Sequence, residues 1–177
     1  MAKLISDNYR NLMTTLHEER PDYGVASWKK WLPMINDIAK SVGARKILDY
    51  GCGKGGLSVA LPLVEVTNYD PAIEKWSATP EPHDFVVCTD VLEHIEPDCL
   101  DAVLDDLVRV TDKVLFASIA TTPAVKTLAD GRNAHLIVEP MEWWLPKLWD
   151  RFMITMVNRP GENHFVVVMS PKKEEAR

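Results

Sequence analysis

The residues best suited to chemistry are three aspartates at the ends of apolar runs, the first of which enters a glycine-rich turn. The sequence ILDYGCGKGG carries Asp49 into a turn that contains Gly51, Gly53 and Gly55. Glycine suits a backbone that turns with positive φ or lies directly against a ligand. The Gly-x-Gly-x-Gly spacing differs from the Gly-x-Gly-x-x-Gly of dinucleotide-binding folds. A ligand-binding turn is favoured, and a plain strand-to-helix connection is the alternative.

The next two acids, Asp70 and Asp90, end the second and third apolar runs. An acid about 20 residues beyond a glycine turn, at a strand end, can accept hydrogen bonds from both hydroxyls of a ribose. A turn-forming aspartate before Pro71 is the plainer interpretation of Asp70. Because ligands of open parallel sheets bind beyond the carboxyl ends of the strands, we expect the three aspartates to lie at one place.

Alternating strands and helices must position these acids. Hydrophobic periodicity predicts helices over residues 6–20, 26–42, 57–61, 98–110 and 140–151. Asp98 is the expected N-cap of the fourth helix, and Pro146 is expected to kink or interrupt the fifth. Apolar runs predict strands over residues 46–50, 64–70, 83–90, 113–120, 152–159 and 164–170. This order predicts an α/β fold with a mostly parallel sheet that ends in an antiparallel hairpin.

The length of 177 residues suits one domain. We expect an N-terminal helical segment on the substrate side (1–44), a core (45–170) and a frayed tail (171–177). The formal net charge of −6 disfavours nucleic acid as the main partner, because phosphate contacts supply most of the affinity for DNA. No apolar run has the length of a signal peptide or a membrane span, and the three cysteines favour reduced thiols. The expected location is the cytoplasm, with no membrane contact.

Three segments together resemble a known family. ILDYGCGKGG, the acid of NYD and DFVVCTDVLEHI are similar to motifs of class I S-adenosylmethionine-dependent methyltransferases. The VLEH sequence and the later stretch HLIVEPMEWWLPKLWDRF resemble the small-molecule branch of that family. The resemblance covers residues 45–170. It implies a Rossmann-like three-layer sandwich, with S-adenosyl-L-methionine as cofactor and S-adenosyl-L-homocysteine as product.

The resemblance also implies roles for individual residues. Asp49 and the glycines would hold the methionine portion of the cofactor, and Asp70 would bind the ribose. The third strand end would line the cofactor beside the sulfonium, while Cys52 has a small side chain suited to the turn. The implied cofactor-binding residues are Asp49, Gly51, Cys52, Gly53, Gly55, Asp70, Cys88, Thr89 and Asp90.

The chain departs from the family between its second and third predicted strands. Residues 71–83, PAIEKWSATPEPH, contain three prolines and are too few for the usual helix and strand. We therefore predict that the family's third strand is missing or vestigial, which leaves about six strands. Trp76 and Ser77 are the residues expected to cover the adenine in its place.

Candidate groups on the acceptor side are Glu93, His94 and His135, each a possible general base. Helix capping by the first two and simple packing of His135 are the alternatives. His17, His83 and His164 attract no functional role, and the histidine spacing implies no metal site. Trp28 and Trp31 with Tyr23 could form a lid, whereas packing is favoured for Trp143, Trp144 and Trp149.

The acceptor class follows from absent motifs. The sequence TDVLEH lacks both the Asp/Asn-Pro-Pro-Tyr of enzymes that methylate exocyclic amines of DNA and the Pro-Cys of cytosine-ring enzymes. The sequence therefore predicts a methyltransferase that acts on a small molecule or a small modified group. The alternative is a non-catalytic subunit that binds or senses the cofactor. A nicotinamide oxidoreductase on a related fold is the third hypothesis, which the glycine spacing disfavours.

Overall fold

The computed structural model describes residues 3–25 and 27–172, and within them the chain forms one six-stranded sheet in the order β2-β1-β3-β4-β6-β5. The strands are β1 (Lys46–Tyr50), β2 (Glu65–Tyr69), β3 (His83–Thr89), β4 (Thr111–Ala120), β5 (Phe152–Asn158) and β6 (His164–Pro171). The helices are α1 (Asp7–Glu19), α2 (Leu32–Ser41), α3 (Gly56–Ala60), α4 (Leu100–Val110) and α5 (Met141–Arg151). Short 3-10 turns are η1 (Lys29–Trp31), η2 (Glu74–Trp76), η3 (Leu92–His94) and η4 (Pro97–Cys99).

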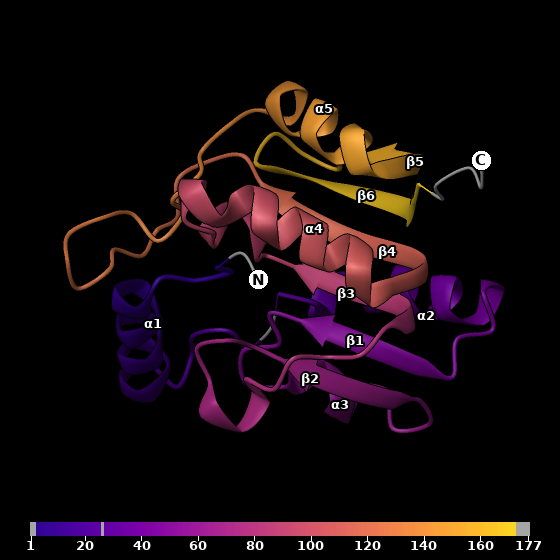
Figure 1. Ribbon diagram of the computed structural model, residues 1–177, viewed down its shortest axis with the longest axis horizontal. Coiled ribbons are helices and arrows are strands. Elements are labelled where there is room, and N and C mark those ends of the chain that lie inside the picture. The colour runs from indigo at the N-terminus through magenta and orange to yellow at the C-terminus, as the bar shows by residue number, and fades with distance from the viewer. Residues whose placement is uncertain (1–2, 26, 173–177) are drawn as a thin grey trace.

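The sheet is parallel from β2 to β4 and antiparallel from β4 to β5, as the sequence predicts. The segment between β2 and β3 holds the single turn η2 and no strand, so the prediction of a missing third strand is confirmed. The short connection therefore leaves β2 at the edge of the sheet, paired with β1 alone (Figure 1).

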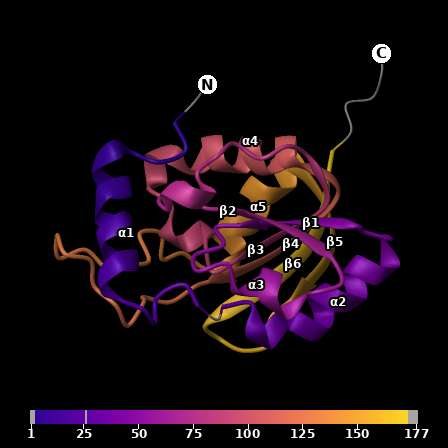
Figure 2. The ribbon, with the colours of Figure 1, turned by 90° about the horizontal axis from the view of Figure 1, so that it is seen from below.

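Helices cover both faces of the sheet, which makes a three-layer sandwich (Figure 2). Helices α4 and α5 lie on one face, and α2 with α3 lies on the other. The strands explain this arrangement, because their successive side chains point to opposite faces. Leu48 and Val86 pack in the cluster that includes α4, whereas Ile47, Phe85 and Val87 pack with the residues of α2 and α3.

Several predicted boundaries moved. The helix expected over residues 26–42 begins at Leu32, because a 3-10 turn precedes it; residue 26 lies outside the described part of the chain. The prediction of Asp98 as an N-cap is wrong, since η4 includes Asp98 and α4 starts at Leu100 without a side-chain cap. Helix α5 continues through Pro146 without interruption.

Two further findings concern the chain ends and membranes. Of the tail expected to fray, Pro171 belongs to β6 and the Lys172 amide donates to the Arg151 carbonyl, so these two residues are part of the fold. The remainder, residues 173–177, lies outside the described residues. Among the described helices, none has the length and apolar character needed to cross a membrane.

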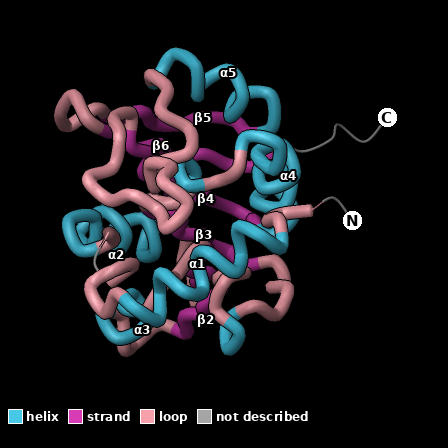
Figure 3. Tube along the Cα trace, turned by 90° about the vertical axis from the view of Figure 1, so that its left-hand side faces the viewer, coloured by secondary structure: helices cyan, strands magenta, loops and turns pink. Residues whose placement is uncertain are grey.

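Helix α1 belongs to neither layer but lies across the strand ends (Figure 3). Its apolar side chains, including Tyr9 and Met13, form a third cluster with Leu128 and Ala134 of the long connection between β4 and α5. The side chain of Ser6 caps the helix by accepting from the Tyr9 amide at 3.1 Å. This small third cluster therefore covers the carboxyl ends of the strands, where the three aspartates emerge.

Candidate active site

The glycine turn between β1 and α3 needs glycine for two reasons. Gly51 and Gly53 have φ values of +76° and +52°, in the left-handed region that glycine adopts without cost. A Cβ on Gly51 would lie 2.4 Å from Cγ2 of Val91, and a Cβ on Gly53 would lie 2.5 Å from the carbonyl oxygen of Gly24. The turn is therefore closely packed against two other segments that border the same cavity.

Two buried acids flank this turn. The Asp70 carboxylate accepts from the Gly53 amide at 3.2 Å through one oxygen and from the Ala72 amide at 3.0 Å through the other. Asp49 is only 3% exposed, and its Oδ2 has no hydrogen-bond partner in the part of the chain that the structure describes. Burial, together with the charge of Asp70, raises the pKa of Asp49 to about 7. An unpaired buried carboxylate oxygen suits a cationic or N–H donor group of a ligand.

A cavity of about 530 Å³ lies beside these acids, under α1. The structure brings seven of the predicted site residues to its wall: Gly51, Gly53, Asp70, Thr89, Asp90, His94 and His135. Five predicted site residues do not line it: Asp49, Cys52, Gly55, Cys88 and Glu93. The carboxyl ends of β1, β2 and β3 therefore meet at one place, as the sequence predicts.

The two predicted cysteines lie behind the cavity wall. The Cys88 side chain is 1% exposed and packs in the core on the α4 face, and Cys52 is 5% exposed within the turn. Burial raises the pKa of both thiols above its usual range, so both remain protonated. Neither is therefore suited to act as a nucleophile.

Glu93 is also withdrawn from the cavity. Its side chain is fully buried, and Oε1 accepts from the Ala120 amide at 2.6 Å, which ties η3 to the end of β4. Burial, followed by the charge of Asp90, raises its pKa well above the usual range. The structure therefore places Glu93 beside the candidate acceptor groups rather than among those that face the cavity.

His94 and His135 face each other at the far end of the cavity. Their rings meet edge to face, with centroids 4.8 Å apart. Nδ1 of His94 lies 2.8 Å from the Ala134 carbonyl oxygen, and Nδ1 of His135 lies 2.6 Å from that of Thr122. Because a carbonyl oxygen only accepts, both Nδ1 atoms carry the proton and donate it, which leaves Nε2 of each ring as an acceptor. Burial lowers the pKa of His94 to about 4, so its ring is neutral at pH 7.

Helix α1 belongs to the segment expected on the substrate side, but the sequence did not single out the residues by which it forms part of the wall. Tyr9, Met13 and His17 all line the cavity, and Tyr23 joins them from the next turn. Tyr9, Met13 and His17 are four residues apart in the sequence, which places them on one helix face. This spacing was the sequence pattern from which their common position could have been predicted. His17 is buried and its Nδ1 has no partner among the described residues; burial lowers its pKa.

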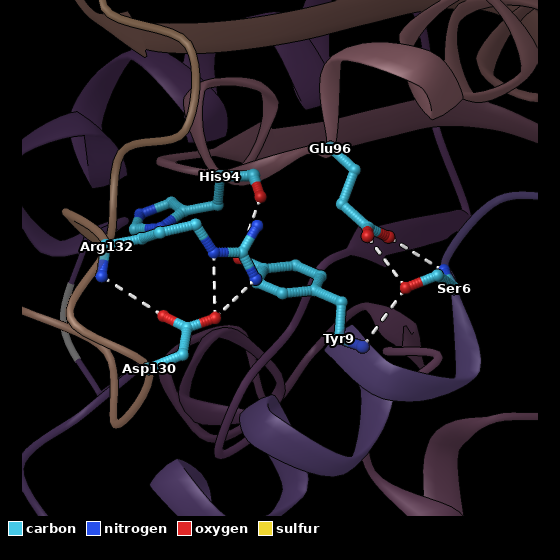
Figure 4. Close-up of polar contacts among 6 residues, drawn as sticks. All are labelled: Ser6, Tyr9, His94, Glu96, Asp130 and Arg132. Carbon is cyan, nitrogen blue, oxygen red and sulfur yellow. Dashed lines mark hydrogen bonds and ion pairs between the residues drawn. The ribbon is translucent and has the colours of Figure 1, made fainter.

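Hydrogen bonds fasten α1 to the segment that carries His94 (Figure 4). The Ser6 amide and hydroxyl donate to the two carboxylate oxygens of Glu96, each at 2.7 Å. The Tyr9 hydroxyl donates to the His94 carbonyl oxygen at 2.8 Å, while Arg132 lies over the Tyr9 ring. The position of α1 over the cavity is thus coupled to the acceptor end.

The tryptophans considered for a lid or an adenine cover lie elsewhere. Trp31 is 7% exposed and packs edge to face on Phe116 in the core. Trp28 and Trp76 do not line the cavity, although the Trp76 carbonyl accepts from the Asp70 amide at 3.1 Å. Of the three on α5, Trp144 is fully buried, in agreement with the packing interpretation, whereas Trp149 is 48% exposed, so packing is wrong for that residue.

The sequence matches the family model described as "Methyltransferase domain" over residues 10–145. The chain belongs to that family. No curated protein matches the sequence at a significant level. The family membership disfavours the nicotinamide oxidoreductase hypothesis and agrees with the resemblance seen in the motifs.

Solved structures share the fold of this methyltransferase-family chain. One is 1,6-didemethyltoxoflavin-N1-methyltransferase of Burkholderia thailandensis, at 17% identity and a TM-score of 0.68, with 98% of this chain and 93% of that chain covered. Another is the N-methyltransferase NodS of Bradyrhizobium japonicum, at 15% identity and a TM-score of 0.62, with 95% of this chain and 100% of that chain covered. At such identities the likeness shows the fold, which is the Rossmann-like α/β fold of methyltransferases.

Proposed function

We propose that this chain transfers the methyl group of S-adenosyl-L-methionine to a small-molecule acceptor and releases S-adenosyl-L-homocysteine. The observation that carries the proposal is the pair of buried carboxylates at the glycine turn, of which Asp49 has an unpaired oxygen. Both of these solved structures contain S-adenosylhomocysteine; the first also contains its small-molecule acceptor, 1,6-didemethyltoxoflavin, and the second is named as an N-methyltransferase.

The residues present fit that cofactor. The methionine portion carries an ammonium group, which would supply the charge and the N–H donors that the Asp49 carboxylate lacks. Asp70 accepts one amide on each oxygen, so a lone pair on each oxygen stays available for the two ribose hydroxyls. Gly51 and Gly53 would let the backbone lie directly against the ligand.

When bound, the sulfonium supplies an activated methyl group, which an acceptor lone pair takes as the carbon–sulfur bond breaks and its electron pair stays on sulfur. The protein contributes position and shelter from water. We assign the shelter to α1, because Tyr9 and Met13 line the cavity from above the strand ends. Nε2 of His94 or of His135 would accept the proton that the acceptor loses. Glu93 would not contact the acceptor but would hold η3, which carries His94, against the end of β4.

The acceptor is proposed to be small because α1 covers a cavity whose volume is typical of small-ligand sites. The alternative of a non-catalytic cofactor-binding subunit is less well supported, since it gives no reason for two histidines and an aspartate at the far end. A cytoplasmic location is part of the proposal and agrees with the three unpaired cysteines.

Titration calorimetry with S-adenosylmethionine and S-adenosylhomocysteine tests the proposal. We expect binding by the wild-type chain, and a loss of about 1–3 kcal/mol of binding free energy in Asp70→Ala, the order expected when hydrogen bonds to a charged group are removed. Asp112→Ala, at an exposed aspartate of β4, is the matched control and should bind as the wild type does. Equal affinity in Asp70→Ala would remove Asp70 from the site. No affinity of the wild type for either ligand would overturn the proposed function.

A further inference from the structure

Three potential metal ligands converge at the acceptor end of the cavity. One ligand atom from each of Asp90, His94 and His135 lies within 4.8 Å of the other two. Asp90 follows β3 directly, His94 ends η3, and His135 lies in the connection after β4. The two histidines are far apart in the sequence, so ligand spacing gave no sign of this group. The fold alone brings them together.

The hydrogen bonds of both histidines are those of metal ligands. Histidines that bind metals almost always donate the second ring N–H to a carbonyl or carboxylate, which fixes the tautomer and the ring orientation. Here Nδ1 of His94 donates to Ala134 and Nδ1 of His135 donates to Thr122. Two unprotonated Nε2 atoms are therefore held in place before any ligand arrives.

The third ligand is held in an unusual backbone conformation. Asp90 is the one non-glycine residue with positive φ in the described chain, at +62°. Its amide donates to the Ser118 carbonyl at 3.1 Å, which fixes it to β4. Strained residues of this kind persist where the surroundings determine them, often at functional sites.

The surroundings of Asp90 supply no lysine or arginine partner in the described chain. Glu93 is fully buried beside Asp90, and its Oε2 has no hydrogen-bond partner among the described residues. Within residues 3–25 and 27–172, neither acid forms an ion pair with a lysine or arginine. A bound cation would compensate the negative charge of the Asp90 carboxylate, which no lysine or arginine of the described chain offsets.

We propose that Asp90, His94 and His135 bind a divalent transition-metal ion, with Zn²⁺ as the reference case. Two imidazoles and one carboxylate suit Zn²⁺, Mn²⁺ or Fe²⁺, whereas Mg²⁺ and Ca²⁺ prefer oxygen ligands throughout. A tetrahedral zinc ion with ligands at about 2.1 Å places them about 3.4 Å apart, whereas the ligand atoms here lie up to 4.8 Å apart, so side-chain rotations must close the group by up to about 1.4 Å. Three protein ligands leave at least one position open toward the cavity.

The open position gives the ion a role toward the acceptor. With the ion bound, Nε2 of His94 and of His135 would be ligands and would no longer act as bases. The ion would instead bind an acceptor oxygen or nitrogen, orient it toward the methyl group and lower the pKa of its proton, which would pass to water. Acceptors with two adjacent donor atoms would be favoured, because they form a chelate. This role rests on the proposed methyl transfer, but metal binding itself does not.

Co²⁺, which replaces Zn²⁺ and gives a visible spectrum that depends on its ligands, is the probe for the test. The untagged, chelator-treated protein is titrated with Co²⁺, then with Zn²⁺ to displace it, and separately with Mg²⁺. We expect one tightly bound Co²⁺ per chain, displaced by Zn²⁺ and not by Mg²⁺. The affinity for Co²⁺ should fall at least tenfold in His135→Asn and in Asp90→Asn. Asparagine is chosen at position 90 because it tolerates the same positive φ.

His164→Asn is the matched control, because His164 lies outside the group, and it should bind Co²⁺ as the wild type does. A cooperative thermal melt and the far-UV circular dichroism spectrum of the wild type show that each variant is folded; if His135→Asn fails this check, Asp90→Asn decides. Equal Co²⁺ affinity in the folded variants, or no stoichiometric binding by the wild type, overturns the metal site. If the wild type binds S-adenosylhomocysteine but no metal, only the metal site is refuted. If it binds metal but not S-adenosylhomocysteine, only the proposed function is refuted.

Discussion

The two ends of the cavity are built in different ways. At the glycine end, one continuous segment from Asp49 to Gly55 supplies backbone and carboxylate, and Asp70 joins it from the adjacent strand. At the acceptor end, side chains come from separate segments that meet only in the folded protein, and α1 covers them. The first end depends on local chain geometry, the second on tertiary packing.

The largest expected loss of function, a loss of both stability and cofactor binding, is at the glycine end, in Gly53→Ala. An alanine at positive φ costs about 1–2 kcal/mol, and its methyl group would also meet the Gly24 carbonyl oxygen at 2.5 Å. Gly43→Ala is the control, since Gly43 has a similar φ of +59° with no atom near the added Cβ. Chemical denaturation should show a clearly larger loss for Gly53→Ala, together with loss of S-adenosylhomocysteine binding. Equal losses of unfolding free energy in the two variants would mean that the close approach of Gly53 to the Gly24 carbonyl oxygen does not restrict the side chain at position 53.

Asp49→Asn should separate stability from binding. The pKa of Asp49 is about 7 in the folded chain and 3.8 as its ordinary value, so the folded protein retains a proton that the unfolded chain releases between these pH values. Stability therefore falls as pH rises from about 4 to 7, by at most about 4 kcal/mol, and the loss persists at higher pH.

The asparagine variant avoids that loss. Thermal melts should show it more stable than the wild type at pH 8, with the difference shrinking toward pH 4, while calorimetry shows weaker cofactor binding. A variant that is no more stable at pH 8 would contradict the buried, unpaired state of the Asp49 carboxylate.

The smallest effect is expected at the acceptor end, in Ser6→Ala. This change removes the cap of α1 and one hydrogen bond to Glu96, at a cost of about 1 kcal/mol. Hydrogen exchange should become faster in α1 while the glycine turn stays protected. Ser41→Ala, at the end of α2, is the control and should leave α1 unchanged. Faster exchange at both ends would show that the two parts of the site are not separable.

The difference between the ends also explains what the sequence could predict. The strands, the glycine turn and the missing third strand follow from local patterns, because each depends on residues that are neighbours in the chain. His94 and His135 were both expected on the acceptor side, but their close grouping with Asp90 could not be predicted, since it depends on how the connection after β4 packs on η3, where the Ile137 amide donates to the Glu93 carbonyl. The Asp98 cap was wrong because Pro97 starts a 3-10 turn that includes Asp98.

The wall formed by α1 lay between these two cases. Residues 1–44 were expected on the substrate side, and the spacing of Tyr9, Met13 and His17 showed which residues share a helix face, but not that this face would form the cavity wall. Apolar and aromatic residues on such a face pack equally well against a sheet, and only the position of α1 across the strand ends makes them part of a cavity. The periodicity of a sequence identifies which residues share a helix face, but it does not identify what that face packs against.

The place of β6 in the sheet has a consequence for biosynthesis. This strand comes late in the chain, yet it lies between β4 and β5, with Phe165, Val166 and Val167 fully buried. During translation, the edge of β4 that pairs with β6 stays unpaired until residues 164–171 have left the ribosome. A nascent chain stopped before that point would expose apolar strand edges, so quality-control proteases should degrade a release product ending at residue 160 far faster than the finished protein.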